Sequence, residues 1–306
     1  MNLYLPIAEM SVSVGLMLGM GGAVGFLSGL FGVGGGFLLT PLLIFSGVPT
    51  AVAVGTAPAQ VVASSVSGAL AQWRRGNVDL KLGTVLLVGG VIGSFVGVHL
   101  VSILRRSGQF DLFVSLTYVT LLGVVGILML VESLRTVRKT SAGGSASLRH
   151  SGQHNWTHGL PFKMRFQRSK LYISAVPPFM LGAFVGLLAA IMGVGGGFLI
   201  VPAMIYLLHV PTNVVIGTSQ FQIIFVTATT TVLNASGNRS VDVVLALLLM
   251  AGGVIGAELG AAAGERLRGE QLRLLLALLV IAVCARVGWD LVSTPPDLFS
   301  IHGPEG

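Results

Sequence analysis

Two glycine-rich segments have the residue types and spacing that could bind a ligand. The chain contains GVGGGFL at residues 32–38 and again, unchanged, at 193–199, and each copy is followed by a proline, Pro41 or Pro202. Glycine permits positive φ angles and close approach of backbone atoms. A helix that begins just after such a turn points unpaired N–H groups and the positive end of its dipole at the turn. The repeated motif therefore predicts an anion site built from backbone groups.

Polar side chains follow each glycine motif at matching positions. Thr56 and Gln60 lie four residues apart after the first copy, and Thr218 and Gln222 repeat that spacing after the second. Residues four apart share one face of a helix, so each pair offers a hydroxyl and an amide to the same ligand. The candidate substrate-binding residues are Gly34, Gly35, Gly36, Thr56, Gln60, Gly195, Gly196, Gly197, Thr218, Ser219, Gln220 and Gln222.

The glycine motif does not match a nucleotide-binding fingerprint. GVGGGF lacks the last glycine of G-x-G-x-x-G, and no acidic residue occurs between Glu9 and Asp79. The chain also has no H-E-x-x-H motif and no cluster of acids within its apolar segments. We therefore expect a protein that is not an enzyme and needs no cofactor.

Histidine and cysteine offer little for metal chemistry. The histidines at 150, 154 and 158 are spaced so that one helix would align their imidazoles. The glycines and the proline among them disfavour a stable helix in that segment. The single cysteine, Cys284, cannot form a disulfide within the chain. The sequence therefore predicts no metal centre.

Composition places the chain in a lipid environment. Of its 306 residues, 53% are hydrophobic and only 9% are charged, and the mean hydropathy is +0.88. Soluble domains contain about 25% charged residues. The net charge of +7 could indicate nucleic acid as a partner, but a membrane protein collects Lys and Arg in its cytoplasmic loops. We therefore expect an all-α polytopic membrane protein that contacts the lipid bilayer and no nucleic acid.

The apolar segments form two similar sets of five. They cover residues 11–31, 37–46, 52–72, 82–103, 110–131, 173–192, 198–208, 214–235, 243–263 and 271–292. An odd number of crossings per repeat turns the second copy upside down in the membrane, which is a recurring design of transporters. The predicted domains are a first transmembrane repeat (1–131), a linker (132–172), a second, inverted repeat (173–292) and a short tail (293–306).

The distribution of Lys and Arg supports this inversion. If the N-terminus is extracytoplasmic, loops 73–81, 132–172 and 264–273 face the cytoplasm with three, eight and three Lys or Arg residues. The loops on the other side, 104–109 and 236–242, hold two and one. By the positive-inside rule, both termini are predicted to be extracytoplasmic and the basic linker to be cytoplasmic.

Helix geometry predicts that both glycine motifs lie near the membrane centre. Gly36 and Ser46 are ten residues apart, or about 15 Å of helix, which is half of the hydrocarbon core. The chain then turns, and Thr50 is the predicted N-cap of the next helix. Gln60 therefore lies about 15 Å back into the membrane. The second copy, read from the opposite side, brings a second glycine turn and Gln222 to the same depth.

The remaining intramembrane features have less specific interpretations. The apolar run before the first glycine motif is longer than half a membrane requires, so a break at Gly19–Gly22 and a full crossing both stay open. Glu258, where the first repeat has Phe95, is the candidate for proton coupling, although a structural role near the helix end is the alternative. Close helix packing accounts for the spaced glycines Gly89, Gly93, Gly97, Gly252, Gly256 and Gly260.

With its doubled G-x-G-G-G-F motif, the prolines that follow, and the Gly-Thr pairs at 55–56 and 217–218, the chain resembles the sulfite exporter TauE/SafE family, also called the toluenesulfonate uptake permease family. This resemblance covers nearly the whole chain. It implies a carrier of the bacterial inner membrane for sulfur oxyanions or organosulfonates such as sulfite, sulfoacetate or toluenesulfonate. The first copy has Ala57-Pro58 where the second has Ser219-Gln220, so the two half-sites are not equivalent.

These observations predict an exporter of sulfite or a related sulfur-containing organic anion. The anion would be held at the two glycine turns and moved by alternating access. The alternatives are a passive anion channel and an uptake permease for organosulfonates. Homo-oligomerisation stays open.

Overall fold

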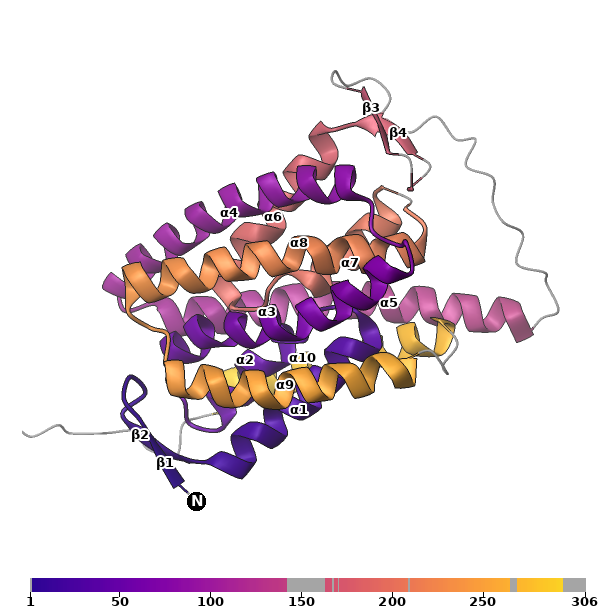
Figure 1. Ribbon diagram of the computed structural model, residues 1–306. Helices are drawn as coiled ribbons and strands as arrows, with labels where there is room; N and C mark the ends of the chain where they lie inside the picture. Colours follow the sequence, from indigo (N-terminus) through magenta and orange to yellow (C-terminus); the bar gives the residue numbers. More distant parts are fainter. Residues whose placement is uncertain are drawn as a thin grey trace, which may run out of the picture.

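A computed structural model of the protein describes residues 2–141, 163–166, 168–169, 171–208, 210–264 and 269–293. Within these ranges the chain forms a bundle of long helices with a small β-hairpin at each of two opposite ends (Figure 1). The first half contains β1 (Asn2–Leu5), β2 (Met10–Ser13), α1 (Val14–Phe31), α2 (Gly36–Phe45), α3 (Thr50–Arg74), α4 (Leu80–Arg106) and α5 (Phe110–Ser141). The second half contains β3 (Lys163–Phe166), β4 (Leu171–Ser174), α6 (Val176–Met192), α7 (Gly197–Tyr206), α8 (Thr212–Leu233), the π-helix η2 (Asn234–Asn238), α9 (Val243–Gly264) and α10 (Gly269–Val292).

The expected all-α polytopic membrane fold is confirmed. Among the described residues, six helices are long and apolar enough to cross a membrane. These stretches are Val14–Phe31, Leu80–Arg106, Phe110–Val131, Val214–Asn238, Val243–Gly264 and Leu274–Val292. The half-length helices α2 and α7, with ten residues each, coincide with the two short apolar segments of the sequence.

Helices at equivalent positions of the two halves run in opposite directions. The start of α3 lies beside the segment that follows α8 and η2, because a Cβ on Gly55 would lie 2.5 Å from the Ser240 hydroxyl. Further along α3, a Cβ on Gly68 would lie 2.5 Å from Nε2 of Gln220, near the start of α8. The two central helices are therefore antiparallel, which is the arrangement that an inverted repeat requires.

Each half begins with an antiparallel β-hairpin. The β1–β2 pairing aligns Asn2 with Ser13, and the β3–β4 pairing aligns Lys163 with Ser174. Hydropathy assigns residues 132–172 to a linker and begins the first apolar segment at residue 11, whereas the structure places the end of α5, all of β3 and part of β4 in that linker and begins α1 at Val14. Four-residue strands are too short to interrupt a hydropathy pattern, so tertiary pairing alone reveals them.

Two local expectations about the first repeat can be compared directly with the structure. Pro49, rather than Thr50, is the N-cap of α3, because its carbonyl accepts the N–H groups of Val52 and Ala53 at 2.9 Å each. The helix α1 continues through Gly19–Gly22 without a break. The chain therefore reaches the first glycine turn through an uninterrupted helix of 18 residues.

Glycines allow helices of different halves to pack with their backbones in contact. The helix α4 packs along α6, and α1 packs along α9. A Cβ on Gly93 of α4 would lie 1.9 Å from the carbonyl oxygen of Ala183, and a Cβ on Gly256 of α9 would lie 2.0 Å from that of Gly22. These contacts exclude even a methyl group, as expected for small-residue helix packing in membranes.

Gly93→Ala is expected to lower the thermal stability of the detergent-purified protein, because the new methyl group would force α4 away from α6. Gly19→Ala is the matched control, since nothing lies within 4 Å of a Cβ at Gly19. Alanine in a helix interior is favoured over glycine by about 1 kcal/mol, so the control should be neutral or slightly stabilising. Equal melting temperatures for the two variants would contradict close packing of α4 against α6.

Candidate functional site

Each glycine motif forms a left-handed turn at the start of a half-length helix. In the first copy Gly34 and Gly35 have φ angles of 83° and 67°, and in the second Gly195 and Gly196 have 77° and 74°. An L side chain is strained in this region, whereas glycine adopts it freely. Gly35 and Gly196 are the N-caps of α2 and α7. We call residues 32–36 and 193–197 the first and second tips.

The tips carry backbone donors that are buried without protein partners. In the described part of the chain, the N–H groups of Gly34–Gly36 and of Gly195–Gly197 donate no hydrogen bond to a backbone carbonyl. All six residues are buried. Both half-helices direct the positive ends of their dipoles at these turns. This is the geometry of an anion site that uses no charged side chain.

The structure brings the two tips together. A Cβ on Gly36 would lie 2.3 Å from the carbonyl oxygen of Val194, and one on Gly197 would lie 1.9 Å from that of Val33. Just beyond the tips, the rings of Phe37 and Phe198 have centroids 5.5 Å apart. The tips therefore touch through their backbones, and no anion fits directly between them in this conformation.

Residues from the two central helices surround the tips. A Cβ on Gly34 would lie 3.1 Å from Cγ1 of Val61 and 3.6 Å from the hydroxyl of Ser65. A Cβ on Gly195 would lie 2.7 Å from Cγ2 of Thr227. Sequence reasoning missed Ser65 and Thr227. Their signal was a hydroxyl residue five positions after the glutamine of each repeat, at equivalent places in both copies.

The predicted glutamines are buried and lack partners. Gln60 and Gln222 are 0% exposed, and neither the amide nitrogen nor the oxygen of either side chain has a hydrogen-bond partner. Gln60 lies against Gly253 of α9, and Gln222 lies against Gly90 of α4. Gln220 also has an unpartnered amide oxygen. Because buried polar groups are nearly always satisfied, these amides are exceptional in keeping hydrogen-bonding capacity that no described protein group uses.

The predicted threonines take part in contacts between the halves. The hydroxyl oxygen of Thr56 accepts the N–H of Asp242 at 3.0 Å, and that of Thr218 accepts the N–H of Asp79 at 3.0 Å. These bonds lie at the starts of α9 and α4, toward opposite ends of the bundle. Ser219 donates its hydroxyl to the carbonyl of Ile216 within its own helix. These hydroxyl groups are thus engaged by protein groups, unlike the amides of the glutamines.

The same two aspartates fasten the β-hairpins. The carboxylate of Asp79 accepts the N–H and hydroxyl of Ser169 at 2.9 and 2.8 Å. The carboxylate of Asp242 accepts the N–H of Ile7 at 3.0 Å. We call the contacts of Asp79 with Thr218 and Ser169 the first latch, and those of Asp242 with Thr56 and Ile7 the second latch.

The other candidates lie away from the tips or outside the described residues. Glu258 is exposed on α9, next to Leu259, which is 62% exposed. It therefore does not belong to the buried cluster of tips and glutamines. His150, His154 and His158 lie outside the described part of the chain.

Gln60→Leu is expected to leave the stability of the purified protein unchanged or higher, because an unpartnered buried amide costs about 1–3 kcal/mol. The melting temperature without ligand measures this effect. Thr56→Val should lower it, since it removes a satisfied hydrogen bond to Asp242. A large destabilisation by Gln60→Leu would mean that the amide has a structural partner.

Comparisons with known proteins identify the family of the chain. Residues 17–287 match the family described as Sulfite exporter TauE/SafE. A probable membrane transporter protein of Xylella fastidiosa (strain 9a5c) is 31% identical over 276 residues, which cover 89% of this chain and 94% of the relative. The probable membrane transporter protein YunE of Bacillus subtilis (strain 168) is 28% identical over 282 residues, covering 90% and 96%.

No solved structure matches the chain significantly. The family match includes both tips, both central helices and both aspartates of the latches. The protein is therefore a membrane transporter by its relatives, and the chain belongs to the sulfite exporter TauE/SafE family.

Proposed function

We propose that this protein exports sulfite or a related sulfur-containing organic anion across a bacterial inner membrane by alternating access, with both termini extracytoplasmic. The observation that carries the proposal is the presence of two buried glycine tips together with buried, unpartnered glutamine side chains on the central helices α3 and α8. Membership of a transporter family argues against an enzymatic role.

The donors at the tips suit a small oxyanion. Sulfite has three oxygens that can each accept hydrogen bonds, and the tips supply several backbone N–H groups that donate to no backbone carbonyl among the described residues. The amides of Gln60 and Gln222 add neutral donors from the central helices. A site without fixed cations binds an anion reversibly, because no buried charge must be left unpaired when the anion leaves. Reversible binding is what a carrier needs.

The closed conformation favours a carrier over a passive channel. Contact between the tips blocks a continuous path, and Thr56, Gln60, Thr218 and Gln222 are all 0% exposed. A channel requires an open aqueous route, whereas a carrier passes through occluded states. We infer that the anion enters when the tips separate toward one side.

The two latches supply a physical basis for alternation. Each connects one half of the chain to the other, through Thr218 and Asp79 at one end and through Thr56 and Asp242 at the other. Opening either end requires the loss of that end's latch, while the other can stay closed. The pseudo-symmetric positions give the two openings similar energies, which is the condition for populating both.

Sulfite flux into proteoliposomes is expected to fall at least about tenfold in Gln60→Leu and in Gln222→Leu, because a hydrogen bond to an anion contributes about 1.5–3 kcal/mol. Flux should be measured for sulfite, thiosulfate and an organosulfonate, with and without a pH gradient. Thr230→Val is the matched control, since its buried hydroxyl already donates to the carbonyl of Val226 within α8.

Unchanged sulfite flux in both glutamine variants would overturn the site assignment. Flux that rises linearly with sulfite concentration, without saturation, would favour the channel. A clear preference for the organosulfonate, driven inward, would favour the uptake permease.

Removing one latch should open one end selectively. Cysteines replacing Ala57 and Ser219, which are equivalent and both 0% exposed, would report access in a Cys284→Ser background. Thr218→Val should speed thiol labelling at position 219, and Thr56→Val at position 57. Loss of a hydrogen bond of about 1 kcal/mol predicts an acceleration of about fivefold.

The reciprocal pairs are the internal controls for this experiment. Thr218→Val should leave labelling at position 57 unchanged or slower, because opening one end keeps the other closed. Faster labelling at both positions in either variant would contradict alternating access.

A further inference from the structure

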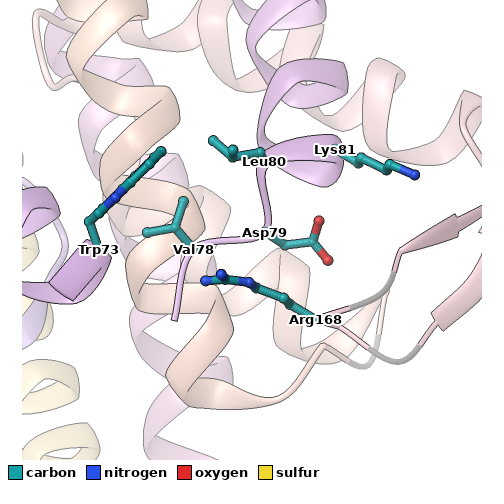
Figure 2. Close-up of a pocket in the computed structure, with 6 residues that line it drawn as sticks. All are labelled: Trp73, Val78, Asp79, Leu80, Lys81 and Arg168. Atoms are coloured by element: carbon teal, nitrogen blue, oxygen red, sulfur yellow. The ribbon is translucent and has the colours of Figure 1, made fainter. Parts of the chain in front are cut away.

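We propose that a pocket beside the first latch binds the phosphate headgroup of an anionic phospholipid. The pocket has a volume of about 260 Å³ and is lined by Trp73, Val78, Asp79, Leu80, Lys81 and Arg168. It lies where α3 ends, α4 begins and the β3–β4 turn approaches (Figure 2). It shares Asp79 with the first latch but is separate from the tips and the glutamines.

Two cations give the pocket its affinity for phosphate. Arg168 donates a hydrogen bond from Nη1 to the carbonyl of Gly76, which fixes the guanidinium at the pocket and leaves its other donors for a ligand. Figure 2 shows Arg168 extending from the hairpin turn toward the side of Val78 and Lys81 extending from α4 in the other direction, with Asp79 between them in this view. Arg168 can donate hydrogen bonds to a phosphate oxygen, and Lys81 adds electrostatic attraction from a greater distance.

The carboxylate of Asp79 lines the pocket but is already bound by neutral donors of the protein. Asp79 is only 3% exposed. Its oxygens accept hydrogen bonds from the N–H and hydroxyl of Ser169 and from the N–H of Leu82. Because the latch already uses the carboxylate, Lys81 and Arg168 are the charged lining groups that remain for a ligand.

An apolar track leads away from the pocket along α3. Val66, Leu70 and Trp73 are 47%, 52% and 51% exposed, and their spacing places them on one face of the helix. Leu80 of α4 is also 44% exposed. A free anion gains nothing from contact with an apolar surface, whereas the acyl chains of a phospholipid pack against it. Tryptophan at the polar end of the track is the residue preferred at a membrane interface.

The opposite end of the molecule lacks this combination. The hairpin position equivalent to Arg168 is Ile7, and the helix position equivalent to Lys81 is Val244. The hydrogen bonds of the latch are thus present at both ends, whereas Lys81 and Arg168 of the pocket have no basic equivalents at the opposite end. Loops at the Arg168 end are the ones that the positive-inside rule assigns to the cytoplasm, where anionic lipids attract Lys and Arg. The presence of these cations at one end therefore matches the higher content of anionic lipid in the cytoplasmic leaflet.

Fluorescence quenching in lipid nanodiscs tests the proposal. Replacing the other tryptophans, Trp156 and Trp289, with Phe leaves Trp73 as the only one, since the chain has three. Brominated phosphatidylglycerol should quench Trp73 with about tenfold higher apparent affinity than brominated phosphatidylcholine, because each cation near the surface favours anionic lipid by a few-fold. Equal quenching by the two lipids would overturn the proposal.

Charge variants distinguish binding in the pocket from general attraction to a basic surface. Lys81→Gln together with Arg168→Gln should abolish the preference for phosphatidylglycerol. Lys81→Gln alone is the milder variant, should reduce it, and does not disturb the bond from Arg168 to Gly76. Arg106→Gln, which removes an exposed cation at the other end of α4, should leave it intact. An equal loss in Arg106→Gln would show general charge attraction and overturn the pocket.

The last experiment repeats the quenching measurement with millimolar inorganic phosphate or millimolar sulfite added. Each is compared with potassium chloride of the same ionic strength. A lipid that is anchored by its acyl chains should resist this competition. If either free anion abolishes the preference while chloride does not, the pocket is a site for soluble anions and the lipid assignment fails. Sulfite flux in the same variants is scored separately, so failure of either proposal leaves the other testable.

Discussion

An unpaired backbone N–H group inside a bilayer costs several kcal/mol unless protein or a ligand satisfies it, and this chain places two groups of them at its centre. The arrangement of the bundle follows from that constraint. The half-helices α2 and α7 begin at the tips, and α3 and α8 cross over them. Every tip residue is buried. Protein thus excludes lipid from the broken backbone.

Glycine has two different physical roles around this centre, and the structure connects them. At the tips it adopts positive φ angles that other residues resist. In α4 and α9 it removes side-chain volume, which lets neighbouring backbones touch. Glycine in α9 and α4 also makes room for buried amides, because Gly253 and Gly90 make the spaces into which Gln60 and Gln222 extend.

Duplication gives the two ends of the molecule the same framework and different side chains. Asp79 and Asp242 join the halves through equivalent hydrogen bonds to Thr218 and Thr56. The hairpins beside them pair in the same register. The two ends therefore share a hydrogen-bonded framework, whereas the side chains around it differ, as Arg168 and Ile7 do. The same backbone framework thus accommodates different side chains at the two ends of the molecule.

The sequence by itself determined the class of fold, the ten apolar segments and the duplicated glycine motif, because hydropathy, segment length and repetition are local properties that survive without tertiary contacts. Helix length also predicted that the tips and glutamines would lie at similar depth. Only the tertiary structure decided that the tips touch, that Thr56 and Thr218 bond to distant aspartates, and that Ser65 and Thr227 face the glycines. Those contacts join residues from different helices, and no periodicity along one helix encodes which side chain on another will meet it.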